Sequence, residues 1–63
     1  MTYNTAITTL QSFGVQARTA YNAVRKSSLR AQTVAPFGHT VNRPRQIIVD
    51  IDGNGGYKLQ LVW

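Results

Sequence analysis

The chain has 63 residues, in which seven Lys and Arg stand against two Asp and no Glu, giving a net charge of +5. A chain of this length forms one domain that buries only about 60% of its unfolded surface, and the absence of cysteine excludes disulfides and thiolate metal sites. No apolar run approaches the roughly 18 residues of a membrane span, and the first residues lack the basic stretch of a signal peptide. We therefore expect a single domain over residues 1–63, soluble and cytoplasmic, with no membrane partner.

Residues 4–31 place apolar side chains at spacings of three and four, which is the pattern of an amphipathic helix. Thr2 or Asn4 could cap its start by accepting a backbone N–H. Gly14 costs about 1 kcal/mol relative to Ala inside a helix, and Ser27 interrupts the apolar stripe, so two helices divided near Gly14, or one ending near Ser27, are the alternatives. We predict one long helix with frayed ends, packed through ordinary core contacts rather than as a coiled coil. Its apolar stripe contains Tyr3, Ala6, Ile7, Leu10, Phe13, Ala17, Ala20, Tyr21, Val24 and Ala31.

Residues 32–45 show no clean hydrophobic period. Pro36 and Gly38 form a stop-and-turn signal, and Pro44 favours extended backbone just before the last segment. We predict an irregular crossing segment here.

Residues 46–63 alternate apolar and polar side chains on both sides of a glycine-rich turn, which indicates a β-hairpin. A two-residue Asn54-Gly55 turn is the first choice from the dipeptide, but it would place Asp50 opposite Leu59 and mix polar with apolar side chains on both faces. A three-residue loop with Gly55 in the left-handed conformation shifts the register by one residue and gathers the apolar side chains on one face. The predicted pairs are Ile51 with Tyr57, Val49 with Leu59, Ile47 with Leu61, and Asp50 with Lys58 as a complementary charge pair.

The predicted fold class is α+β, with an N-terminal amphipathic helix packed on a C-terminal two-stranded antiparallel hairpin in the order αββ. Two strands make a thin sheet with both edges unpaired. Ile48 and Val62 are the apolar exceptions on the otherwise polar outer face of this hairpin. We therefore predict that a homodimer or a higher closed oligomer completes the sheet, with Ile48 and Val62 in its interface.

Residues suited to catalysis or metal binding are few. Asp50 and Asp52 share a strand face and could form a dyad, but they flank a tight turn, where Asp commonly hydrogen-bonds the backbone. With Asn54 they match the first half of an EF-hand calcium loop, but Leu61 stands where the bidentate Glu is required. His39 has no second ligand near it in the sequence. We expect a protein that is not an enzyme and has no catalytic residues, metal, cofactor or small-molecule substrate.

The basic residues are the strongest functional signal, because an excess of cations suits anionic partners, nucleic acid first among them. Three of them fall on the helix face away from the apolar stripe, a fourth follows one turn later, and two bracket Pro44. Such groups could bind phosphates, although cations near a helix end also stabilise its dipole and Arg45 could contact the ring of Trp63 across the hairpin. The predicted nucleic-acid-binding residues are Arg18, Arg25, Lys26, Arg30, Arg43 and Arg45.

The sequence thus favours a small, basic, non-catalytic protein that contacts nucleic-acid phosphates. The alternative is a structural, assembly or inhibitor protein acting through protein–protein contacts, for example a small phage or virion component. The Thr-, Asn- and Gln-rich, acid-poor composition would suit a phage or mobile-element product, although no motif supports that origin. No helix-turn-helix, zinc-finger, RRM or KH signature is present.

Overall fold

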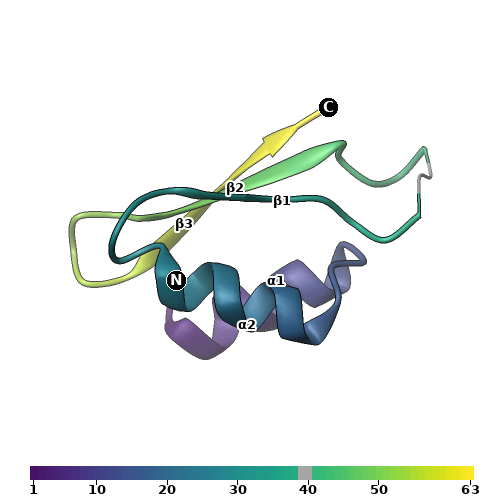
Figure 1. Cartoon of the computed structure of the whole chain (residues 1–63). Helices are drawn as coiled ribbons and strands as arrows, with labels where there is room; N and C mark the ends of the chain where they lie inside the picture. The colour runs from purple at the N-terminus through teal and green to yellow at the C-terminus, as the bar shows by residue number, and fades with distance from the viewer. Residues whose placement is uncertain (39–40) are drawn as a thin grey trace.

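In the part of the chain that the structure describes, two helices lie against the same face of a three-stranded antiparallel sheet, and the other face of the sheet carries no helix (Figure 1). The computed structural model describes residues 1–38 and 41–63. The strands lie in the order β1-β2-β3, so β2 is central. This confirms the α+β class, with one more helix and one more strand than the sequence predicted. The elements are α1 (Tyr3–Ser12), α2 (Ala17–Lys26), β1 (Gln32–Val34), β2 (Gln46–Ile51) and β3 (Tyr57–Val62).

The prediction of one long helix is wrong, because the chain ends α1 with a glycine cap. Gly14 has a φ of 96°, a left-handed conformation that glycine adopts without steric cost. Its N–H donates to the Gln11 carbonyl at 2.9 Å, and the Val15 N–H donates to the Leu10 carbonyl at 3.1 Å. These two bonds form a Schellman motif, completed by the apolar pair Leu10 and Val15, both of which are buried. At the other end, the Thr2 side chain caps α1 by accepting the Thr5 N–H at 3.2 Å.

The second helix ends at Lys26, five residues before the predicted limit at residue 31. Ser27 caps this end and is only 1% exposed. Its hydroxyl donates to the Val24 carbonyl at 2.7 Å, which satisfies a polar group on the buried side of the helix. Ala17 and Ala31, two members of the predicted apolar stripe, are exposed. The stripe therefore holds at Ala6 and Leu10 in α1 and at Ala20 and Val24 in α2, but it does not include Ala17 or continue to Ala31.

The hairpin register is confirmed in full. Ile51 pairs with Tyr57, and the Asp52 N–H donates to the Gly56 carbonyl at 3.1 Å. The loop between Asp52 and Gly56 therefore has three residues, as predicted. Gly55 has a positive φ of 85°, as expected, and Gly53 also has a positive φ, of 82°. The remaining predicted pairs are present as well: Val49 with Leu59, Ile47 with Leu61, and Asp50 with Lys58.

Part of the predicted irregular segment forms the third strand. β1 pairs antiparallel with β2 and sets Thr33 opposite Ile48 and Val34 opposite Ile47. The outer edge of β2 is therefore covered by the chain itself, and the expectation that both hairpin edges are open is wrong for that edge. A strand this short has too few residues to produce a recognisable alternation.

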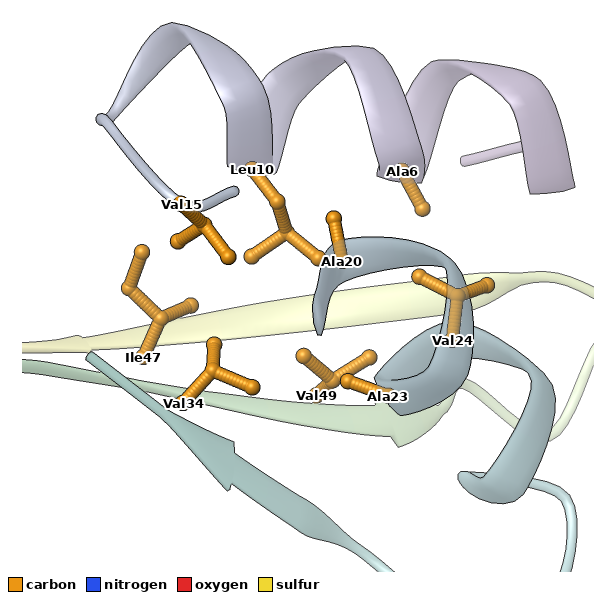
Figure 2. Packing of buried hydrophobic residues seen from close by; sticks show 9 residues of the cluster. All are labelled: Ala6, Leu10, Val15, Ala20, Ala23, Val24, Val34, Ile47 and Val49. Atoms are coloured by element: carbon orange, nitrogen blue, oxygen red, sulfur yellow. The ribbon is translucent and has the colours of Figure 1, made fainter. Parts of the chain in front are cut away.

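The core lies between the helices and the inner face of the sheet, as Figure 2 shows. Several of its helical members are alanines, whose small side chains let the helix backbone approach the sheet closely. Leu10 and Ile47 are fully buried, and each such side chain contributes about 1.5–3 kcal/mol to folding. The buried cluster contains Ala6, Leu10, Val15, Ala20, Ala23, Val24, Val34, Ile47 and Val49.

Candidate nucleic-acid interface

The helix α2 presents its cations on the side that faces away from the sheet. Ala20 and Val24 are fully buried and fix the inner side of the helix. Arg18 and Arg25 are exposed, and their spacing of seven residues, almost two helical turns, puts them on one face about 10 Å apart along the axis. Asn22 lies between them along the axis, on the side of this face that borders β1. We call the residues Arg18, Asn22 and Arg25 the outer face of α2.

One flank of this outer face combines a cation with aromatic rings. The Arg25 guanidinium carbon lies 5.4 Å from the centroid of the Tyr21 ring, within cation–π range, and Tyr21 itself is 40% exposed. Tyr3 packs edge-to-face against Tyr21, with ring centroids 6.1 Å apart, and also contacts Tyr57 on β3. Burial, followed by the neighbouring Tyr21 hydroxyl, raises the pKa of Tyr3. Tyr3 thus packs against Tyr21 on the side of β3, and part of the Tyr21 side chain remains exposed to solvent.

The opposite flank borders a shallow groove of about 200 Å³ between α2 and β1. Lys26 stands at its rim, and Ala23 with Val34 forms its apolar floor. The Gln32 side chain donates to the Arg30 carbonyl at 2.9 Å, which ties the end of the groove to the turn after α2. The polar residues along the groove are Thr19, Asn22, Lys26, Gln32 and Thr33.

Arg30 does not continue the helix as predicted, because α2 ends before it. It is exposed in the turn between α2 and β1, and its N–H donates to the Lys26 carbonyl at 3.3 Å. It therefore follows Arg25 and Lys26 along the same end of the domain.

Arg43 lies against the turn between the two helices rather than on an open surface. Its Nη1 donates to the Phe37 carbonyl at 3.0 Å, and the Phe37 N–H donates to the Gly14 carbonyl at 2.9 Å. A Cβ on Gly14 would lie only 2.6 Å from Nη1 of Arg43. The guanidinium thus holds the Phe37 segment against Gly14, which gives Arg43 a structural contact; the phosphate contact of Arg43 stays a prediction.

Arg45 stands apart from the helical cations, immediately before β2. It is exposed, and its N–H donates to the Val62 carbonyl at 2.7 Å. The structure therefore brings Arg18, Arg25 and Lys26 together on α2 with Arg30 after them, and it leaves Arg45 on the sheet.

The acidic residues lie away from the outer face of α2. Within residues 1–38 and 41–63, the one ion pair joins the Met1 ammonium to Asp52, with a nitrogen–oxygen distance of 4.0 Å. The Asp52 carboxylate accepts the N–H groups of Asn54 at 2.7 Å and Gly56 at 3.1 Å. The hydrogen bond from the Asn54 N–H, followed by the one from the Gly56 N–H, lowers the pKa of Asp52. Asp52 thus stabilises the β2–β3 turn through backbone hydrogen bonds. Across the described ranges, no carboxylate lies within 4.0 Å of a Lys or Arg nitrogen.

The remaining predicted site residues are placed as follows. Ile48 and Val62 are partly exposed on the outer sheet face, where Ile48 pairs with Gln60 and Val62 with Gln46. His39 lies outside the described residues. The polar lining of the α2–β1 groove was not found from the sequence, since it depends on a strand that sequence patterns do not reveal.

No protein-family model matches the chain, and no curated protein and no solved structure matches it either. Among the residues that the structure describes, neither helix is long and apolar enough to cross a membrane.

Proposed function

We propose that this protein is a small, non-catalytic nucleic-acid-binding module that uses the outer face of α2. The observation that carries the proposal is the pairing of Arg25 with the exposed Tyr21 ring, at 5.4 Å, on a helix whose cations have no carboxylate partner in the described part of the chain. Arg18 and Arg25 supply phosphate contacts from one face, and Lys26 and Arg30 extend the positive surface at the end of the helix. The net charge of +5 adds long-range attraction for a polyanion.

The preferred ligand in this proposal is single-stranded nucleic acid. An aromatic ring beside cations is the arrangement that single-strand binders use, because every base has a face that can stack while the backbone needs only charge. Asn22, between the two arginines, adds a hydrogen-bonding group that tolerates different bases.

The test is fluorescence polarisation with labelled single strands and duplexes of random sequence over a salt series. Each neutralised phosphate of a single strand contributes about −0.7 to the slope of log affinity against log salt. Arg25→Ala should weaken binding and flatten that slope. Lys58→Ala removes one cation from the outer sheet face and is the matched control, which should leave binding nearly unchanged. Absence of binding at low salt, or equal loss in both variants, would refute this interface.

A second function, assembly through self-association, is favoured by a separate observation. Within residues 1–38 and 41–63, no helix covers the outer sheet face, Ile48 and Val62 are partly exposed there, and β3 forms an outer edge of the sheet (Figure 1). We propose that copies of the chain associate along this edge or through this face. Sedimentation of the wild type against Ile48→Asp tests it. A folded monomer at tens of micromolar in both proteins would contradict the proposal.

A further inference from the structure

The backbone of β3 alternates between groups that bond to β2 and groups that point out of the sheet. Asp52 and Gly56 form a hydrogen-bonded pair at the turn, so Lys58, Gln60 and Val62 direct their N–H and C=O groups toward β2. Tyr57, Leu59 and Leu61 therefore direct theirs to the outer edge. Met1 confirms this direction, because the Tyr57 N–H donates to the Met1 carbonyl at 2.9 Å and the Met1 ammonium donates to the Tyr57 carbonyl at 2.7 Å.

The two edges of the sheet differ in their protection against further pairing. β1 has only three residues and is followed within two positions by Pro36, and short edges with nearby proline resist strand addition. β3 has six residues, contains no proline and carries a single charge, Lys58. Of its outward groups, those of Tyr57 are bonded to Met1, and those of Leu59 and Leu61 have no backbone partner within the described ranges. β3 is therefore the open edge.

We propose that β3 pairs antiparallel with β3 of a second copy, about a two-fold axis at Gln60. In this register Leu59 of each copy lies opposite Leu61 of the other, and each such pair exchanges both of its hydrogen bonds. The proposal rests on the self-association put forward above and specifies its register. It joins the open groups of β3 to one another, and pairing ends at Tyr57, whose backbone Met1 already occupies.

The side chains agree with a second copy as the occupant. Leu59 and Leu61 are only partly buried and pack on the core from the inner face, so pairing sets two such leucine pairs side by side in one continuous sheet. On the outer face, Lys58 lies opposite Val62 of the second copy and not opposite its Lys58, so the two-fold brings no like charges directly together. The interface is isologous and closes as a dimer, because both copies use the same β3 edge about a two-fold axis.

Cysteine cross-linking tests the register, since the chain has no cysteine of its own. Two Gln60→Cys copies would meet across the two-fold in a non-hydrogen-bonded pair, with Cα atoms about 4.5 Å apart, inside the roughly 4.4–6.8 Å range of disulfides. Lys58→Cys is the matched control. Both side chains are exposed on the same strand face, but the two Lys58 positions are offset by four residues, about 14 Å, across the axis.

We expect Gln60→Cys to form a covalent dimer in a glutathione buffer at least tenfold faster than Lys58→Cys at equal concentration. Equal rates, or no cross-link, would overturn the proposed register. As a second measurement, Gln60→Lys and Gln60→Glu should each sediment as weaker dimers than the wild type, and a mixture of the two should restore dimer formation. If the wild type is a dimer but Gln60→Cys does not cross-link, this register is refuted and self-association stands. If the wild type is a monomer, the register and self-association are both refuted. Neither result bears on nucleic-acid binding.

Discussion

The guanidinium of Arg43 occupies the space in which any side chain at residue 14 would begin. A Cβ on Gly14 would meet Nη1, Cζ and Nε of Arg43 at 2.6, 2.7 and 2.9 Å. Gly14 is thus favoured by two features: its φ of 96° at the end of α1, and the Arg43 guanidinium, which any Cβ at residue 14 would displace. Because the Phe37 N–H also bonds to the Gly14 carbonyl, this one residue joins the two helices to the segment that precedes β2.

The first prediction concerns Gly14→Ala. The left-handed backbone alone costs a non-glycine residue about 1–2 kcal/mol, and displacing Arg43 adds the loss of its bond to Phe37, so we expect a total loss of about 2–3 kcal/mol in the free energy of unfolding. Gly53→Ala is the control, because Gly53 has a φ of 82° with nothing within 4 Å of its Cβ position. Urea denaturation measures both.

The Arg43→Ala background completes this test. Without the guanidinium, Gly14→Ala should cost no more than Gly53→Ala, because only the backbone strain remains. If the cost of Gly14→Ala is the same with and without Arg43, the contact does not carry the stability assigned to it.

The second prediction concerns the core. Leu10 is fully buried beside Val15 and Ala20, so Leu10→Ala should lower the free energy of unfolding by about 2–5 kcal/mol. A domain of this size has only about 3–5 kcal/mol in total, so the variant should be largely unfolded at 25 °C by circular dichroism. Leu29→Ala makes the same chemical change at a residue that is 86% exposed and should leave the spectrum and the melting temperature almost unaltered.

The third prediction concerns acid stability. The N–H groups of Asn54 and Gly56 hold the pKa of Asp52 below its ordinary value of 3.8. A carboxyl whose pKa is lower in the folded state stabilises the fold above its unfolded pKa, and this stabilisation is lost as the pH falls through the folded pKa. Thermal melts of the wild type should therefore decline as the pH drops below about 4. Asp52→Asn should be less stable than the wild type at pH 7 and should lack this part of the decline. If the variant and the wild type lose the same thermal stability as the pH falls, Asp52 is not the source of the loss.

The fourth prediction concerns the aromatic part of the candidate interface. Tyr21→Ala removes the exposed ring and should weaken single-strand binding by about 1–3 kcal/mol, roughly 5-fold to 150-fold. Tyr21→Phe keeps the ring and should bind almost as well as the wild type. Affinity that falls equally in both variants would mean that the hydroxyl, and not the stacking surface, makes the contact.

The hairpin and the inner face of each helix could be predicted because side-chain period determines them locally. A one-residue shift of the β2–β3 register would exchange the faces and separate Asp50 from Lys58, so several independent features select one answer. The helix break was harder. Gly14 alone only weakens a helix, and the break is stabilised by the contact of Val15 with Leu10, which forms after the chain has turned.

The positions of β1 and Arg43 could not be predicted, because both are set by partners distant in sequence. Thr33 and its neighbours become a strand only when β2 is present to bond with them. The helical cations were placed correctly on α2 by the helical period alone. Arg43 carries the same charge but lies against Gly14 and donates to the Phe37 carbonyl, and composition gives no sign of that difference.

The bonds between Met1 and Tyr57 have a practical consequence for tags and fusions. Any peptide bond to the Met1 nitrogen replaces the ammonium near Asp52 with a neutral amide. Because Met1 pairs antiparallel with Tyr57, the added residues would be directed along β3 past Lys58 toward Leu59. An N-terminal tag would then compete within the same molecule for the backbone groups that a second copy needs, at an effective concentration in the roughly millimolar range of a short intramolecular link. Measurements of association are therefore best made on protein whose Met1 amine is free.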